Sequence, residues 1–343
     1  MSNPLFFIRQ YSNDQFFHGG VGYADAEKIL QNKNFNPIEF PCYLDFSFTA
    51  KFRRFYYLVK LLFSIPKGSC IVFLFPVFAK MNRLLIRLLG RRKDIRLICF
   101  LADIDGIKDG DEKLLAQEIR QFKRYDQFIV HNDSMAEWLQ KQTPSASIVS
   151  ISFFDFLVLP FDGNREKSYE IVFAGNLEKS EFLQNLSELN VQSPLLHFNL
   201  YGPGLMDDFG LQANVDYRGI FKPSELPGKL KGSFGLVWDG DSIGEPAGSL
   251  GNYMRYISHH KLSLYIVSGL PLIVPEMAAS AVLVRKFEIG FTITSLDEIQ
   301  EKINDISSER YQQMRENMKP LADKISRGNC LGSALEELFR NVS

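Results

Sequence analysis

Short apolar runs alternate with longer amphipathic stretches through the first half of the chain. The apolar runs have strand length, and the stretches between them carry apolar residues at helical spacing. Strands are predicted at residues 4–8, 35–40, 70–75, 95–101, 127–131 and 147–151. Helices are predicted at residues 23–31, 51–64, 81–89, 113–123 and 134–142. Continuous apolar strands separated by helices indicate a parallel sheet that is covered on both faces.

The alternation restarts after a polar connector at residues 160–167, which has no apolar period and predicts a linker. Strands are predicted at residues 169–174, 197–201, 215–218, 234–238, 272–274 and 290–294, and helices at 180–189, 224–230, 251–268, 278–287, 296–306 and 308–320. The pattern therefore predicts an α/β chain with two successive α/β domains, residues 1–160 and 161–320, and a ligand cleft between them. Residues 321–343, after Pro320, are predicted to form a further amphipathic helix.

Composition adds an asymmetry of charge to this picture. The 343 residues include 39 Lys and Arg and 40 Asp and Glu, and the net charge of −1 argues against a general nucleic-acid binder. Residues 51–98 nevertheless hold twelve basic residues and one acid, Asp94, so that this block carries +11. Apolar residues at helical spacing within residues 51–60 and 81–89 predict two basic amphipathic helices.

The cysteines and the apolar runs bear on the compartment. The four cysteines show no CxxC spacing, which argues against a zinc site and a disulfide framework. Cys70 and Cys99 lie in apolar runs, as buried thiols of a reducing compartment do. The first residues show no signal-peptide pattern, and no apolar run reaches the ~20 residues of a spanning helix. We therefore expect a cytoplasmic protein.

Glycine-containing turns in the second half are suited to a phosphorylated ligand. Gly175 and Asn176 follow a predicted strand and precede a predicted helix, whose free N–H groups can accept a diphosphate, and Lys179 adds a positive charge there. Tyr201 and Tyr217 lie in the next two strands and could stack on a base or contact a phosphate. Each feature taken alone is equally that of an ordinary βα turn or a packed aromatic.

Lys261 conflicts with its local surroundings. It lies near the start of an apolar helix, where the helix dipole disfavours a cation, so its presence there suggests a function such as binding a pyrophosphate. Asp239 ends an earlier predicted strand in the segment Phe234-Gly-Leu-Val-Trp-Asp-Gly-Asp241.

Together these segments resemble a known family. The similarity is carried by Ala174-Gly-Asn-Leu, Leu200-Tyr-Gly-Pro-Gly, Gly235-Leu-Val-Trp-Asp-Gly, His260-Lys-Leu-Ser-Leu-Tyr and Ser268-Gly-Leu-Pro, and in the first half by the segments at residues 126–135 and 154–156. They resemble GT-B glycosyltransferases, and among these the bacterial glucosyltransferase 3-like and β-1,6-galactofuranosyltransferase proteins of surface-glycan assembly. The resemblance implies a GT-B fold with two Rossmann-like domains that face a central cleft. It also implies that the last helix, residues 321–343, packs back on the N-terminal domain.

The resemblance implies a UDP-sugar donor in the C-terminal domain, with galactofuranose or glucose as the sugar, and a glycan acceptor in the N-terminal domain. The donor-binding residues that it implies are Gly175, Asn176, Lys179, Tyr201, Tyr217, Asp239, His260 and Lys261. It implies no cofactor beyond the donor substrate. Relatives tend to show Asn-x-Pro-His-Lys where this chain has Ile257-Ser-His-His-Lys261, so we expect the approach to Lys261 to differ.

The stereochemistry and the catalytic base are inferred by analogy. The Glu-x7-Glu pair of retaining GT-B enzymes is absent, since Asp occupies position 239 and no Glu follows eight residues later, and this favours inversion. Inversion needs a general base for the acceptor hydroxyl. Asp103 and Asp105 end an apolar strand of the N-terminal domain and are the candidates, although either could simply cap a turn.

Two further patterns are weaker. Asp-x-Asp at 103–105 and at 239–241 also matches the metal site of GT-A enzymes, but a GT-A fold leaves no place for the second half, so we expect no metal. His18, Gly19 and Gly20 form a glycine-rich segment, predicted as a loop ahead of a helix, that could face the donor phosphates or the acceptor. As a dinucleotide fingerprint it is incomplete, and His18 is equally an ordinary loop histidine.

The resemblance also suggests what the basic block at residues 51–98 could bind. Surface-glycan acceptors are often lipid-linked, so the block is interpreted as a seat on an anionic membrane surface at the inner face of the cell membrane. The alternative is that its helices pack on the sheet and its charges are merely solvated. Nucleic acid is not expected because no aromatic and basic stacking pattern accompanies the charge. Association into a homo-oligomer stays open.

Two other functions remain compatible with the sequence. One is a non-catalytic nucleotide-sugar-binding partner of another transferase, and the other is a nucleotide-sugar isomerase or epimerase, which shares the doubly wound fold. The first would bind UDP without releasing it from any UDP-sugar, and the second would act without an acceptor.

Overall fold

The computed structural model describes residues 3–9, 18–39, 47–77, 80–205 and 213–340, with the backbone alone at 18–20 and 80–81. The chain forms two compact units, which we call the N-terminal unit (Met1–Ile151 with Leu331–Ser343) and the C-terminal unit (Ser152–Cys330). These borders differ from the expected ones at residues 160 and 320.

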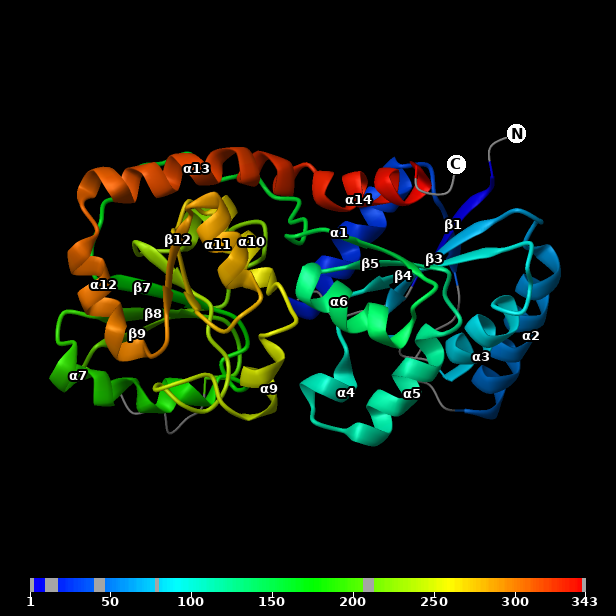
Figure 1. The fold of residues 1–343 in the computed structure, drawn as a ribbon, viewed down its shortest axis with the longest axis horizontal. Helices are drawn as coiled ribbons and strands as arrows, with labels where there is room; N and C mark the ends of the chain where they lie inside the picture. The colour runs from blue at the N-terminus through cyan, green and yellow to red at the C-terminus, as the bar shows by residue number, and fades with distance from the viewer. Residues whose placement is uncertain (1–2, 10–17, 40–46, 78–79, 206–212, 341–343) are drawn as a thin grey trace. The chain divides into compact units, whose positions relative to one another are not determined.

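The N-terminal unit is built on six parallel strands in the order β2-β1-β3-β4-β5-β6. The strands are β1 (Leu5–Arg9), β2 (Asn36–Glu39), β3 (Cys70–Phe75), β4 (Arg96–Leu101), β5 (Gln127–Val130) and β6 (Ser147–Ser150). The helices are α1 (His18–Asn32), α2 (Phe48–Ser64), α3 (Lys80–Leu89), α4 (Asp105–Lys108), α5 (Glu112–Phe122), α6 (Asp133–Gln142) and α14 (Asn329–Arg340) (Figure 1). Every residue of β3 is buried, as its continuous apolar run predicts.

The C-terminal unit also has six parallel strands, in the order β12-β11-β10-β7-β8-β9. The strands are β7 (Glu170–Ala174), β8 (His197–Tyr201), β9 (Val215–Gly219), β10 (Phe234–Leu236), β11 (Leu272–Pro275) and β12 (Gly290–Ile293). The helices are η1 (Glu181–Glu188), α7 (Leu189–Gln192), α8 (Leu226–Lys229), α9 (Gly248–Tyr253), α10 (His260–Val267), α11 (Ser280–Phe287), η2 (Leu296–Glu298), α12 (Ile299–Asp305) and α13 (Ser308–Ser326). This is the Rossmann strand order, and the direction of winding reverses between β7 and β10.

The segment at residues 160–167 is part of the C-terminal unit and not a free linker. Arg165 is buried, and its guanidinium donates hydrogen bonds to the carbonyl oxygens of Leu230 (2.9 Å), Gly232 (3.1 Å) and Ser268 (2.9 Å). The same guanidinium lies 4.3 Å from the ring centroid of Phe161. The polar sequence predicted a solvated connector, but Arg165 bonds this segment to the loop that contains Leu230 and Gly232 and to the loop that contains Ser268.

The last helices also differ from the prediction. A single helix was expected over residues 321–343. Instead, α13 continues through Pro320 to Ser326, and a separate helix, α14, begins at Asn329. Met318, Ala322 and Ile325 are buried on α13, and this packing outweighs the missing proline N–H. α14 lies beside α1 in Figure 1, in the N-terminal unit.

Contacts from the first half of the chain hold α14 in the N-terminal unit. Lys33 Nζ lies 2.7 Å from Glu336 Oε1, and the ring centroids of Phe35 and Phe339 are 6.2 Å apart. The Gln127 amide donates to the Leu338 carbonyl over 3.3 Å.

A tyrosine joins the two strands at which the winding of the C-terminal sheet reverses. The fully buried Tyr265 of α10 accepts a hydrogen bond from the Ala174 N–H (2.9 Å) and donates one to the Leu236 carbonyl (3.1 Å). Gly235 makes room for it, since a Cβ there would lie 2.3 Å from the tyrosine ring. The ends of β7 and β10 are therefore braced by one hydroxyl group.

We expect Tyr265→Phe to lower the free energy of unfolding by about 1–3 kcal/mol, because two buried backbone groups lose their partner. Urea denaturation followed by circular dichroism measures the change. Tyr169→Phe is the matched control, since its hydroxyl bonds Asn304 at an exposed position. Equal stability of the two variants would contradict the bracing role.

Candidate functional site

The reversal point of the C-terminal sheet gathers most of the predicted donor residues. β7 and β10 are neighbours in the sheet, and the chain leaves their carboxyl ends toward opposite sides. Ligands of open α/β sheets bind at such a point. The turn at residues 175–180 follows β7, and Asp239 follows β10.

Asp239 contacts two side chains from the start of α10, those of Lys261 and His259. Its Oδ1 lies 3.0 Å from Lys261 Nζ, and its Oδ2 lies 2.7 Å from His259 Nε2. Burial by itself would raise the pKa of Asp239, but Lys261 and His259 outweigh burial and hold the pKa well below its usual range. The carboxylate is therefore ionised throughout the physiological range.

Lys261 is directed at the turn after β7. Its ammonium lies 4.2 Å from the ring centroid of Phe173, and its Cε would be 2.9 Å from a Cβ built on Gly175. A side chain at position 175 would therefore displace the end of Lys261 from the turn. The side chain is 16% exposed, so the ammonium is largely shielded from water and yet reachable.

A second glycine turn supports the first. Gly202 has a φ of +128°, and a Cβ on it would lie 1.8 Å from the Gly175 carbonyl oxygen. The Leu177 N–H donates to the Pro203 carbonyl over 2.9 Å, which joins the turns after β7 and β8. The Asn176 side chain accepts a hydrogen bond from the Glu178 N–H at 3.1 Å. The Gly175–Asn176 turn is thus fixed by its neighbours before any ligand arrives.

The other predicted donor residues differ in how accessible they are. Lys179 is exposed on the turn, and Tyr217 is 43% exposed, with its hydroxyl donating to the Gly202 carbonyl over 3.1 Å. Tyr201 is buried, and its hydroxyl donates to the Lys229 carbonyl and accepts from the Lys231 N–H. That Tyr201 contacts the donor stays a prediction, and the burial of its hydroxyl does not favour it.

Adjacent histidines have different surroundings. The predicted residue, His260, stacks on Phe154 with centroids 5.1 Å apart and meets the edge of Phe156. The residue that contacts Asp239 is His259, which sequence reasoning did not select. Nothing in the sequence separates these two adjacent histidines. The predicted helix over residues 251–268 is also wrong, because α10 begins at His260 after an irregular stretch, so Lys261 lies in the first turn.

The candidate bases of the N-terminal unit share one lysine. Lys108 Nζ lies 3.2 Å from Asp103 Oδ2 and 2.5 Å from Asp105 Oδ1. Burial lowers the pKa of Lys108, but the two carboxylates more than offset it and raise the pKa overall. Both aspartates follow β4 at the carboxyl edge of the sheet, as predicted.

Glu118 of α5 fixes the loop that carries these aspartates. It is 2% exposed, and it accepts hydrogen bonds from the N–H groups of Asp105 (3.1 Å) and Gly106 (2.9 Å). Burial raises the pKa of Glu118 to about 7. Gly106 is required here, because a Cβ on it would lie 2.3 Å from the Leu115 nitrogen.

The glycine-rich segment at the start of the chain does not form the predicted loop. α1 begins at His18, so His18, Gly19 and Gly20 form its first turn. Their side chains lie outside the described residues. Among the described residues, no group of three His, Cys, Asp or Glu side chains could hold a metal ion. Metal independence stays a prediction.

Comparison with known proteins agrees with this architecture. Family models of the glucosyltransferase 3-like N-terminal domain and C-terminal domain match residues 7–153 and 171–338. A β-1,6-galactofuranosyltransferase, WbbI of Escherichia coli K12, is 28% identical over 286 residues, 81% of each chain. Glucosyltransferase 3 of Streptococcus gordonii is 27% identical over 239 residues, 68% of this chain and 67% of that protein.

Solved structures show the same fold at low identity. Sucrose-phosphate synthase of Thermosynechococcus elongatus superposes with a TM-score of 0.68 at 12% identity and covers 99% of both chains. Anabaena HepE, solved with UDP and glucose, superposes with a TM-score of 0.64 at 11% identity over the whole of both chains. The two parallel sheets and these likenesses show a GT-B fold, which confirms the predicted fold class. The chain belongs to the glucosyltransferase 3-like family, and the two relatives above are a galactofuranosyltransferase and a glucosyltransferase.

The ionised Asp239 predicts a pH dependence. A carboxylate whose folded pKa is lowered contributes stability above its unfolded pKa of about 3.9 and loses that contribution as the pH falls toward the folded value. We therefore expect the stability advantage of the wild type over Asp239→Asn to be full at pH 7 and to shrink below about pH 4. Urea titrations at several pH values test this. An advantage that grows on acidification would contradict the assigned ionisation.

Proposed function

We propose that this chain transfers a hexosyl group from a UDP-sugar to a glycan acceptor of cell-surface polysaccharide or glycoprotein assembly, with inversion. The proposed sugars are galactofuranose and glucose, in keeping with the galactofuranosyltransferase and the glucosyltransferase among the relatives. HepE, of the same fold, is described in complex with UDP and glucose, which supports a UDP donor here.

One observation carries the donor assignment: a shielded ammonium stands beside a glycine turn at the reversal point of the sheet. The diphosphate would lie against the Gly175–Asn176 turn and near Lys261. The Gly175 N–H itself already donates to the Tyr201 carbonyl over 2.9 Å, so the charge of Lys261 carries most of the proposed contact. Asp239 offsets the cost of burying Lys261 and keeps it extended. Lys179 adds a second, exposed cation on the same turn, and Tyr217 lies in β9 with its hydroxyl on the Gly202 carbonyl.

The chemistry that these residues support is displacement at the anomeric carbon. The acceptor oxygen attacks that carbon while a base takes its proton, and the bond to UDP breaks with its electron pair on the diphosphate. Lys261 stabilises the charge that develops on the leaving group. We assign the base to Asp103 or Asp105, and we assign Glu118 a positioning role through the backbone of Asp105. The acceptor is proposed to be lipid-linked.

Lys261→Ala is expected to weaken UDP binding and to lower kcat/KM by about 10²–10³, since one preorganised charge at the leaving group is lost. Calorimetric titration with UDP and UDP release from UDP-glucose and UDP-galactofuranose, with alkyl glycosides as acceptors, measure both effects. Lys302→Ala is the matched control, because Lys302 is an exposed lysine of α12. Normal kinetics in Lys261→Ala would refute the site. UDP binding without release from any UDP-sugar would instead favour a non-catalytic partner, and conversion of the sugar without acceptor would favour an epimerase.

Substitution of the true base is expected to lower kcat by roughly 10²–10⁴ without weakening UDP binding, because the base acts on the acceptor. The variants are Asp103→Asn and Asp105→Asn, measured by the same two assays. Asp109→Asn, an exposed aspartate at the end of α4, is the control. If both variants keep wild-type turnover, the base lies elsewhere.

A further inference from the structure

α2 exposes a row of apolar side chains along its outer face. The exposed fractions are 84% for Phe48, 67% for Phe52, 58% for Tyr56 and 88% for Phe63, and Phe55 and Val59 are exposed as well. Their spacing of three or four residues places them on one side of the helix. A contiguous exposed apolar surface of this kind marks an interaction site.

The inner face of α2 does not account for this row. Ala50, Arg54 and Leu58 are the buried residues of the helix. An ordinary surface helix turns its apolar side chains inward and its charges outward. Here a buried arginine lies on the inner face while aromatic rings lie in solvent, so the outer row serves something other than packing on the sheet.

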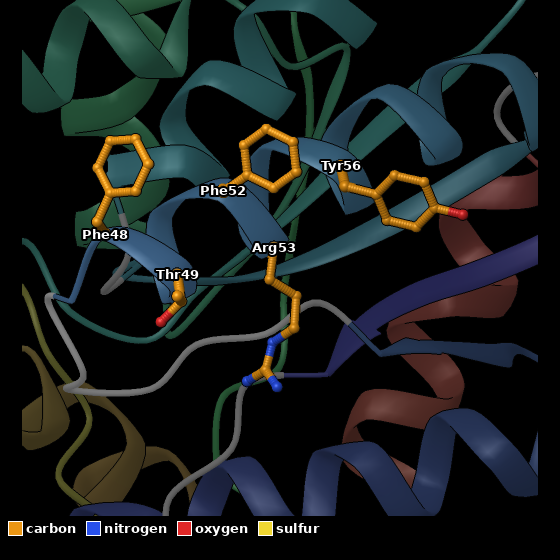
Figure 2. A pocket seen from close by; sticks show the side chains of 5 residues that line it. All are labelled: Phe48, Thr49, Phe52, Arg53 and Tyr56. Atoms are coloured by element: carbon orange, nitrogen blue, oxygen red, sulfur yellow. The ribbon is translucent and has the colours of Figure 1, made fainter.

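The first turns of α2 also form a hollow of about 570 Å³, lined by Phe48, Thr49, Phe52, Arg53 and Tyr56. Figure 2 shows Phe48, Phe52 and Tyr56 in succession along the helix, with Arg53 and Thr49 projecting to another side. One exposed end of the helix therefore carries a row of rings with a cation beside it.

The charge around this row has a single sign. α2 contains no acid, and Lys51, Arg53 and Lys60 are exposed beside the rings. The rest of the basic block contributes less than the sequence suggested. Arg92 pairs with Asp94 at 2.7 Å and donates to two backbone carbonyls. On α3, the apolar residues Leu85, Ile86 and Leu89 are buried, so the apolar surface of the basic block lies on α2.

We propose that the outer face of α2 docks on an anionic lipid bilayer. Aromatic rings settle at the headgroup level of a bilayer, and lysine and arginine beside them contact lipid phosphates. A second copy of the chain fits this face less well, because a two-fold interface would bring the acid-free basic faces of two α2 helices together. Exposed rings beside cations also suit a single-stranded nucleic acid, so the test below includes an oligonucleotide that separates this occupant from a bilayer. The proposal rests on this face alone and is independent of the donor site.

Cosedimentation of the purified full chain with vesicles tests the proposal. We expect binding to phosphatidylcholine vesicles with about 30 mol% phosphatidylglycerol to be at least about tenfold tighter than to phosphatidylcholine alone, and to weaken with salt. The combined variant Phe52→Gln, Phe55→Gln and Phe63→Gln should lose binding by at least about tenfold. The control replaces exposed apolar residues of the C-terminal unit by Val191→Gln and Val282→Gln and should bind as the wild type does. UDP binding and circular dichroism confirm that each variant is folded.

Equal, weak sedimentation of the wild type with both vesicle types would overturn the proposal, as would unaltered binding of the α2 variant. A dimer in light scattering that the α2 variant converts to a monomer would assign the face to a second copy. Binding of a single-stranded oligonucleotide that the variant abolishes, without vesicle binding, would assign it to nucleic acid. If vesicle binding fails while UDP still binds, the membrane proposal is overturned and the donor site is not.

Discussion

The arrangement of the candidate site depends on the carboxylate of Asp239. It holds the ammonium of Lys261 on one oxygen and the ring of His259 on the other, at 3.0 and 2.7 Å. An isolated ammonium at this depth would be costly, and an isolated carboxylate equally so. Because the charges of Asp239 and Lys261 compensate each other, Lys261 is accommodated in the first turn of α10, where the helix dipole disfavours a cation.

The fold supplies the geometry that this ion cluster needs. Tyr265 braces β7 against β10, so that the two strand ends stay in register with α10. Gly175 and Gly202 let the turns after β7 and β8 lie against each other and against Lys261. The N-terminal unit uses a related device, because Lys108 joins Asp103 and Asp105 while Glu118 anchors their loop. In both units, charge pairing places polar groups at the carboxyl edge of a parallel sheet.

Much of the architecture could be predicted from the sequence, for a physical reason. Central strands such as β3 are continuous apolar runs because both of their faces are buried, and the twelve strands among the described residues were all predicted, with small differences at their ends. The errors fall where tertiary contacts outweigh local signals, as at Pro320 inside α13, Arg165 inside the supposed linker and the break before α10. Lys261 was selected because a cation near the start of an apolar helix departs from ordinary helix preferences, and the turn at Gly175 was selected because a glycine stands there between a strand and a helix. His259 was not, because only the folded backbone decides which of two adjacent histidines faces Asp239.

The most direct test of the donor site is a crystal structure of the full chain with UDP. The account predicts electron density for the diphosphate beside the Gly175–Asn176 turn, within hydrogen-bonding distance of Lys261 Nζ. Density for UDP at another strand edge, with the Asp239–Lys261 pair uncontacted, would contradict it.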